Sequence, residues 1–147
     1  MPKVARTIGT TDESITRTER ELGRRLPPSF RRWLLEKNGL GLGSVHVYPV
    51  LDDRDPRKTW DSIVRYFNVG WEAWLEIFDA ERSAFANLLP FADFGTGDYY
   101  CFDYSTLGDA GEPVVVLWSH ETGECEPRGD SFEDFARRLQ AREFESD

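Results

Sequence analysis

The sequence predicts a single α+β domain in which helices pack against a mainly antiparallel central sheet. The chain has 147 residues, a length that suits one domain around one hydrophobic core. Helical and extended patterns follow in the order helix, helix, strand, helix, hairpin, strand, helix, and the connections between the later strands are short. Because short connections join antiparallel strands, this order favours an antiparallel sheet with helices against one face over a parallel, doubly wound sheet.

Two short helices are expected at the start of the folded region. The first is predicted between Thr11 or Asp12, either of which can cap the free amide groups of the first turn, and Gly23, which can end the helix. The second is predicted from Pro28, a residue that suits the first helical position, to the stop at Gly39. Apolar residues recur at helical spacing in both segments, so each helix is expected to bury one side.

A strand and a longer helix are predicted next. Residues 44–50 are rich in β-branched and aromatic residues and predict a strand that ends near Pro49, followed by a polar loop over residues 51–58. From residue 60 to 79 the apolar residues keep a period of about 3.6, which is typical of an amphipathic helix, with Gly70 as a potential break. This helix is expected to cover the sheet and to leave some aromatic surface exposed.

The last third of the chain predicts most of the sheet. Residues 88–105 contain two apolar stretches around Gly95-Thr96-Gly97-Asp98, whose glycines can adopt positive φ, and they predict a β-hairpin. Residues 112–120 are apolar on both faces of an extended chain, as expected of a central strand. A short edge strand within residues 121–130 and a closing helix, capped by Ser131, complete the fold.

The domain is predicted to span residues 11–143, between a flexible N-terminus (1–10) and a short C-terminal tail (144–147). The longest uninterrupted apolar run is Val114–Trp118, far shorter than the ~20 residues of a membrane span. The N-terminal residues contain no apolar segment typical of a secretion signal, so the protein is expected in the cytoplasm with no membrane partner. Its two cysteines, Cys101 and Cys125, are expected to be reduced thiols.

Charge is distributed unevenly along the chain, whose net charge is −9. Residues 1–50 hold 9 Lys and Arg against 5 Asp and Glu, or +4, whereas the remainder holds 9 against 22, or −13. Such an acidic portion repels nucleic acid and attracts a basic protein, although acidity also serves solubility alone. Four arginines in "GRRLPPSFRRW", residues 23–33, are interpreted as a solvated basic face, so no nucleic-acid partner is expected.

Several patterns in the sequence are candidates for catalytic or ligand sites. Gly39, Gly41 and Gly43 lead from a helix into a strand, the reverse of a dinucleotide-binding loop, so a helix stop with a flexible connector is favoured. Two groups of aspartates, one at residues 52, 53 and 55 and one at residues 93, 98 and 103, lack the ligand spacing of a calcium loop. Turn and strand-end aspartates are the simpler interpretation.

The histidines and cysteines, His46, His120, Cys101 and Cys125, have no short-range spacing that would enforce a zinc site or a thiol–imidazole pair. Cys101 is interpreted as a small buried residue, and His120, at a strand end, as a solvated side chain. The chain also contains neither G-x-S-x-G nor H-E-x-x-H, so no recognisable hydrolytic motif is present.

Taken in order, several segments resemble the SUKH superfamily, the Smi/Knr family of fungal cell-wall-synthesis regulators and bacterial toxin-immunity proteins. They are "ERELGRRLPPSFRRWLLEKNG", a strand ending in "VYPV", the hairpin "LLPFADFGTGDYYCFDYS", the strand "EPVVVLWSHETGE" and the closing "SFEDFARRL". The resemblance runs from about Thr11 to Leu139, and residues 52–87 contribute no matching motif. It implies an α+β fold with a central sheet flanked by helices, no catalytic residues and no cofactor.

The resemblance also implies a function for a bacterial member: a non-enzymatic immunity protein that binds and neutralises a toxin, often a nuclease, in the cytoplasm. The acidic portion of the chain would then face a basic groove on the toxin and block it. The predicted contact residues are Asp93, Phe94, Asp98, Tyr99 and Asp103, with Trp60, Trp71 and Trp74 as secondary candidates. Two alternatives stay open: a regulatory scaffold without a toxin partner, and an enzyme that holds a metal on the hairpin carboxylates.

Overall fold

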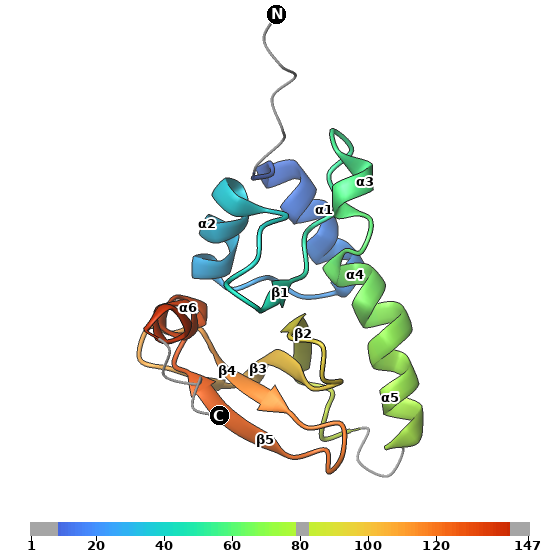
Figure 1. Ribbon diagram of the computed structural model, residues 1–147, viewed down its shortest axis with the longest axis vertical. Helices are drawn as coiled ribbons and strands as arrows, with labels where there is room; N and C mark the ends of the chain where they lie inside the picture. The colour runs from blue at the N-terminus through green and yellow to red at the C-terminus, as the bar shows by residue number, and fades with distance from the viewer. Residues whose placement is uncertain (1–8, 79–82, 142–147) are drawn as a thin grey trace, which may run out of the picture.

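The predicted α+β domain is confirmed by the computed structural model, which describes residues 9–78 and 83–141 (Figure 1). A five-stranded antiparallel sheet has its strands in sequence order: β1 (His46–Val47), β2 (Leu88–Asp93), β3 (Tyr99–Leu107), β4 (Pro113–Trp118) and β5 (Cys125–Gly129). The predicted hairpin is β2 and β3, and the predicted central strand is β4. No helix in the described ranges has the length and apolar character needed to cross a membrane.

Three helices begin where the sequence predicts, two of them at side-chain caps. They are α1 (Asp12–Leu22), α2 (Pro28–Lys37) and α6 (Phe132–Gln140). The Thr11 hydroxyl accepts a hydrogen bond from the amide of Ser14 at 3.1 Å, and Gly23 ends α1 in the left-handed conformation with φ of 76°. The Ser131 hydroxyl caps α6 in the same way. Local side-chain chemistry therefore sets the starts of α1 and α6, whereas α2 begins at Pro28 without a side-chain cap.

Gly9 and Thr10, just before the predicted start of the domain at residue 11, also pack against the folded chain. Thr10 is buried, its amide donates to the carbonyl of Leu34 at 3.0 Å, and its hydroxyl donates to Asp52 at 2.7 Å. A Cβ atom on Gly9 would lie 2.1 Å from the carbonyl oxygen of Leu35, so this segment fits closely against α2. The rest of the predicted N-terminus, residues 1–8, and the predicted tail, residues 144–147, lie outside the described residues.

The helix predicted over residues 60–79 forms from Ile63 to Ile77, and Gly70 does not break it. It consists of α4 (Ile63–Arg65), a π-helical turn η1 (Tyr66–Trp71) and α5 (Glu72–Ile77), which run on without interruption (Figure 1). A Cβ atom on Gly70 would lie 3.0 Å from the Tyr99 hydroxyl oxygen, so the glycine allows the helix to approach β3 closely. The preceding segment, predicted as a loop, contains a separate short helix, α3 (Pro56–Thr59).

Helices cover both faces of the sheet, and the expectation of a single covered face is wrong. Successive strand residues point to opposite faces, and Tyr99 contacts Trp71 of η1 while Tyr100 contacts Phe135 of α6. Aromatic rings fill both layers. The phenylalanine cluster, on the α2 and α6 side, is Phe30, Phe91, Phe102, Phe132 and Phe135; the tryptophan cluster, on the other side, is Trp71, Trp74, Phe78, Phe85, Tyr99 and Trp118.

Candidate functional site

The turn between β2 and β3 projects beside the turn after β4 and beside the continuous helix of α4, η1 and α5, residues 63–77, here called the aromatic helix. Gly95 and Gly97 have φ of 89° and 99°, values that side chains rarely adopt. A Cβ atom on Gly97 would also lie 3.0 Å from Nδ1 of His120, so this glycine is required both by its backbone conformation and by the close contact. The two turns therefore form one continuous surface.

Asp98 joins these turns through His120. Its Oδ1 atom accepts a hydrogen bond from the amide of His120 at 3.0 Å and lies 2.5 Å from the Nδ1 atom of the same residue. The imidazole ring packs against Trp74, with ring centres 5.5 Å apart. The expectation that His120 is simply a solvated strand-end residue is therefore wrong, because its ring has a carboxylate partner on one side and an indole on the other.

Asp93 anchors the base of the turn. The Tyr48 hydroxyl donates to its Oδ2 atom at 2.5 Å, and the amide of Gly95 donates to its Oδ1 atom at 3.1 Å. Tyr48 stacks face to face on Tyr66 at 3.7 Å. Burial, together with the hydrogen bond to Asp93, raises the pKa of Tyr48 well above its usual value. Tyr48 is therefore a neutral hydrogen-bond donor. Asp93 holds the base of the turn through these hydrogen bonds, and its side chain is still partly exposed to solvent.

The hairpin carboxylates do not converge on a common point. Asp103 lies in the middle of β3, where it accepts hydrogen bonds from the amide and the hydroxyl of Ser105. Five residues of extended strand separate the two aspartates by about 17 Å. Across the described ranges, 9–78 and 83–141, His, Cys, Asp and Glu side chains form no group of three or more that could hold a metal ion.

Neither cysteine forms a thiol–imidazole pair with His46 in the described part of the chain. Burial raises the pKa of Cys101 well above its usual value, and partial burial raises that of Cys125 to about 11. Both thiols are therefore protonated near neutral pH and are poor nucleophiles. His46 contacts the rings of Tyr48 and Tyr66 instead of either thiol.

The predicted contact residues divide into core and surface positions. Trp71 is 1% exposed and Tyr99 is also buried, so neither side chain is available to a partner in this structure. Phe94 and Trp60 are exposed, and the Arg65 guanidinium lies 5.3 Å from the centre of the Trp60 ring. Trp74 is partly buried against Trp118. Asp93 and Asp98 are partly exposed beside Phe94.

An exposed apolar stripe on the aromatic helix adds residues that the sequence analysis did not assign to the site. Val69 and Ile77 are 59% and 67% exposed, and Ala73 lies between them at the same four-residue spacing. Residues four apart share one side of a helix, so these side chains point together to the surface. In the sequence, these residues are recognisable as apolar positions that fall outside the side of the helix predicted to be buried.

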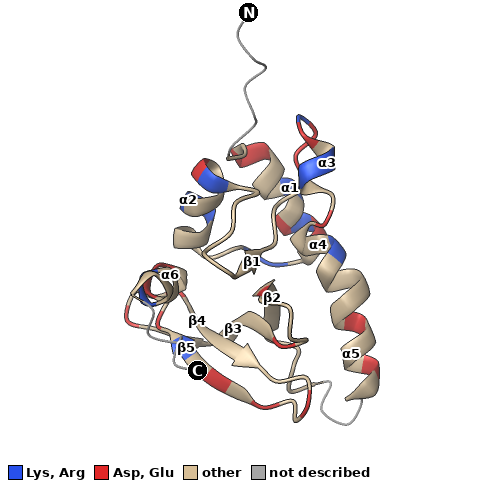
Figure 2. Ribbon diagram, in the orientation of Figure 1, with Lys and Arg blue, Asp and Glu red and all other residues tan. Residues whose placement is uncertain are grey.

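This surface, here called the hairpin–helix face, comprises the exposed residues of segments 60–78, 93–98 and 119–124. Its acidic residues are Asp61, Glu72, Glu76, Asp93, Asp98, Glu121 and Glu124, and the basic residue of these segments is Arg65. Figure 2 shows the acidic positions on α5, at the end of β2 and in the turn between β4 and β5. These segments therefore combine negative charge with exposed apolar side chains.

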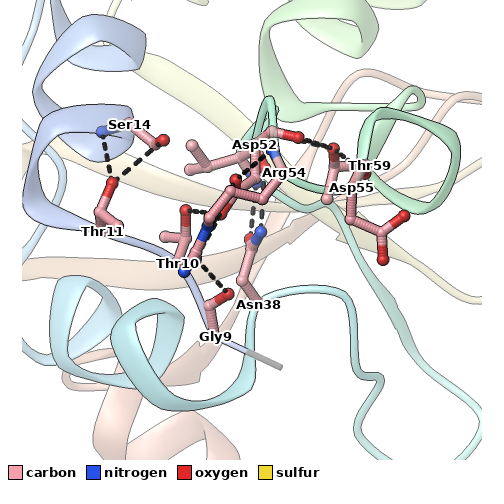
Figure 3. Close-up of polar contacts among 10 residues, drawn as sticks. Gly9, Thr10, Thr11, Ser14, Asn38, Asp52, Arg54, Asp55 and Thr59 are labelled. Atoms are coloured by element: carbon pink, nitrogen blue, oxygen red, sulfur yellow. Dashed lines mark hydrogen bonds and ion pairs between the residues drawn. The ribbon is translucent and has the colours of Figure 1, made fainter. Parts of the chain in front are cut away.

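A second polar cluster surrounds the buried carboxylate of Asp52 (Figure 3). Asp52 accepts hydrogen bonds from the Thr10 hydroxyl at 2.7 Å, from the amide of Arg54 at 2.9 Å and from its guanidinium at 2.7 Å. A cavity of about 530 Å³ beside it is lined by residues of both charges, among them Asp12, Glu13, Arg17, Arg20, Asp53 and Arg54. The mixed charges select no particular ion, and the cluster fastens the N-terminal segment to the loop before α3.

Acid is expected to destabilise the protein through Asp52 and Asp134. Hydrogen bonds from Arg54 hold the pKa of Asp52 below its usual range. Burial alone would raise the pKa of Asp134, but the hydrogen bond from the Asp130 amide and the charges of Arg138 and Arg137 outweigh it, so this pKa is also lowered. Because both folded-state pKa values are lowered, the stabilisation is present above about pH 4 and is lost as the pH falls through the folded-state values. Urea unfolding at a series of pH values measures this loss, and Asp52→Asn should flatten the profile. An unchanged slope in that variant would contradict the assignment.

A comparison with curated proteins finds no match. Residues 9–138, which include the whole sheet and most of α6, match the model of the SMI1 / KNR4 family (SUKH-1). The match covers well over half of the chain, and the chain therefore belongs to the SMI1/KNR4 (SUKH-1) family.

Proposed function

We propose that this protein is a non-enzymatic immunity protein that neutralises a cognate toxin by covering the toxin's active face. The SMI1/KNR4 (SUKH-1) family, to which the chain belongs, includes immunity proteins. The observation that carries the proposal is the hairpin–helix face, where exposed Val69 and Ile77 lie among acidic side chains. A toxin that cleaves nucleic acid exposes a basic groove, and such a groove is complementary to this face.

The mechanism is occlusion. Carboxylates of the face occupy the positions on the toxin that bind substrate phosphates. Their long-range attraction to the basic groove speeds the encounter of the two proteins and fixes their relative orientation. Trp60, Phe94 and the apolar stripe supply side chains that lose contact with water in the complex, and such residues dominate binding energy at protein interfaces. The protein acts in the cytoplasm, the compartment in which a nuclease meets its substrate and in which thiols such as Cys101 stay reduced.

The direct test is co-expression with the product of the adjacent open reading frame. Rescue of growth and co-purification of the two proteins support an immunity function. If the neighbouring product is toxic and this protein neither binds it nor restores growth, the proposal fails. Co-purification with a product that has no toxic effect would instead favour the regulatory scaffold.

Placing positive charge on the apolar stripe should prevent toxin binding. The double variant Val69→Lys plus Ile77→Lys adds two lysines facing a basic partner, and we expect binding at least about 100-fold weaker, from the loss of two interface anchors and from like-charge repulsion. Both side chains are exposed, so the fold should persist. Titration calorimetry with purified toxin, together with growth rescue, measures the effect.

The matched control is Leu40→Lys plus Leu107→Lys, which makes the same change of charge at exposed leucines outside the hairpin–helix face. This control should bind the toxin within about threefold of the unmodified protein, because rim and remote charges contribute little. Equal losses in the two double variants would show that overall charge, and not this face, controls binding.

A further inference from the structure

A second surface, distinct from the hairpin–helix face, has the opposite charge. A groove of about 1040 Å³ runs between α1, the connection to α2, α2 itself and the ends of β3 and β4. Five arginines line it (Arg20, Arg24, Arg25, Arg31 and Arg32), and the acidic residue in the lining is Glu19. The lining therefore carries a formal charge of +4 in a protein whose net charge is −9.

The frame of the groove is held rigidly. Gly23 turns the chain in the left-handed conformation at the end of α1, and the Tyr104 hydroxyl donates to the carbonyl of Arg25 at 2.6 Å. The Arg24 guanidinium donates to the carbonyl of Ala86 at 2.9 Å and lies 4.9 Å from the centre of the Tyr104 ring. A preorganised backbone lowers the entropy lost when a ligand binds.

Several groove arginines are available to a ligand. Arg31 is engaged by ion pairs with Glu19 at 2.7 Å and with Asp12 at 3.2 Å. Arg20, Arg25 and Arg32 are exposed, and within the described residues their side chains have no ion-pair partner. Exposed guanidinium groups on a fixed frame suit paired hydrogen bonding to carboxylates.

Apolar side chains lie along the same groove. Leu107 is 63% exposed and Leu35 is 37% exposed, and both are in the lining together with Pro28. Water-exposed leucines beside arginines match a ligand that carries both carboxylates and apolar side chains. A polyphosphate chain alone would leave the leucines without a partner.

We propose that this arginine groove binds an acidic segment of a protein partner, with carboxylates on Arg20, Arg25 and Arg32 and an apolar side chain against Leu107. The groove is open to solvent, and its charge is complementary to carboxylates. A nucleic acid is less suited, because an extended polyanion experiences the −13 charge of residues 51–147 as well as the groove. The proposal goes beyond toxin neutralisation, since it gives the protein a second partner of opposite charge.

The test uses the full-length protein and a fluorescein-labelled peptide of glutamate and leucine, with binding followed by fluorescence anisotropy at low and physiological salt. The double variant Arg25→Glu plus Arg32→Glu should bind at least about 10-fold more weakly, because two attractive contacts become repulsive. The control variant Arg57→Glu plus Lys58→Glu changes the net charge equally at exposed residues of α3, outside the groove, and should bind nearly as well as the unmodified protein. Leu107→Ser should weaken the binding of the leucine-containing peptide but leave the binding of a glutamate–glycine peptide of the same charge unchanged.

Four results would overturn the proposal. They are an absence of peptide binding at low salt, equal losses in the groove and control variants, tighter binding of an oligothymidylate of the same charge, and self-association that the groove variant abolishes. The third result would identify a nucleic-acid site and the fourth a contact with a second copy. Circular dichroism checks each variant, and Arg20→Glu plus Arg32→Glu provides a second groove variant if the first does not fold.

Discussion

Replacing Trp118 with alanine is expected to lower the free energy of unfolding by about 3–5 kcal/mol, the largest effect of any change considered. Trp118 on β4 is fully buried at the centre of the tryptophan cluster. Its ring contacts those of Trp71, Trp74, Phe78, Phe85 and Tyr99, with centres 5.0–6.1 Å apart. Removing the indole leaves a cavity among rigid rings that cannot collapse to fill it, and both apolar burial and ring contacts are lost.

Urea unfolding followed by far-ultraviolet circular dichroism measures this effect without depending on tryptophan fluorescence. Trp60→Ala removes an indole that is 60% exposed and should change stability by less than about 1 kcal/mol. Trp118→Phe should be milder than Trp118→Ala, because the buried Nε1 atom makes no hydrogen bond within the described structure. Similar losses for Trp60→Ala and Trp118→Ala would contradict the central position of Trp118.

Replacing Asp52 with alanine is expected to lower the free energy of unfolding by about 2–4 kcal/mol. The carboxylate is buried and joins Thr10, 42 positions away in sequence, to the loop of Arg54. Without it, the hydroxyl of Thr10 loses its acceptor inside the protein. We therefore expect the N-terminal segment to detach from α2 before global unfolding.

Asp53→Ala is the matched control, because the neighbouring carboxylate is 76% exposed and makes one surface ion pair with Arg17. Loss of this carboxylate should change the free energy of unfolding by less than about 1 kcal/mol. Hydrogen exchange of the Thr10 amide, which donates to Leu34, reports local detachment in Asp52→Ala. If Thr10 exchange is unchanged while stability falls, the role given to Asp52 in holding this segment is wrong.

The elements that the sequence predicts well are those with local signals. Thr11, Gly23 and Ser131 act on amides and carbonyls within four residues, so α1 and α6 follow from the sequence directly. The hairpin follows from the glycines of its turn. In contrast, the contact between Thr10 and Asp52 spans 42 positions, and no local pattern predicts a partner at that separation.

The hairpin is predictable from its local turn signal, but the surroundings of its individual side chains depend on tertiary packing. Tyr99 is buried because the aromatic helix covers its face of the sheet, whereas the order of elements in the sequence predicts only one covered face. His120 gained a carboxylate partner because two turns far apart in sequence meet. The π-helical turn was missed because the period of apolar residues in a single segment does not reveal one extra residue in a turn.

The two edges of the sheet restrict how a partner can bind. β1 has two residues, and β5 contains Pro127 between the charged Glu126 and Arg128. Very short strands, prolines and charges are the features by which natural proteins prevent another chain from pairing with an exposed sheet edge. Recognition by strand addition is therefore disfavoured at both ends of the sheet, and a partner must bind through side chains instead of extending the sheet. The same protection allows a sheet with such an aromatic interior to remain free of edge-to-edge aggregation.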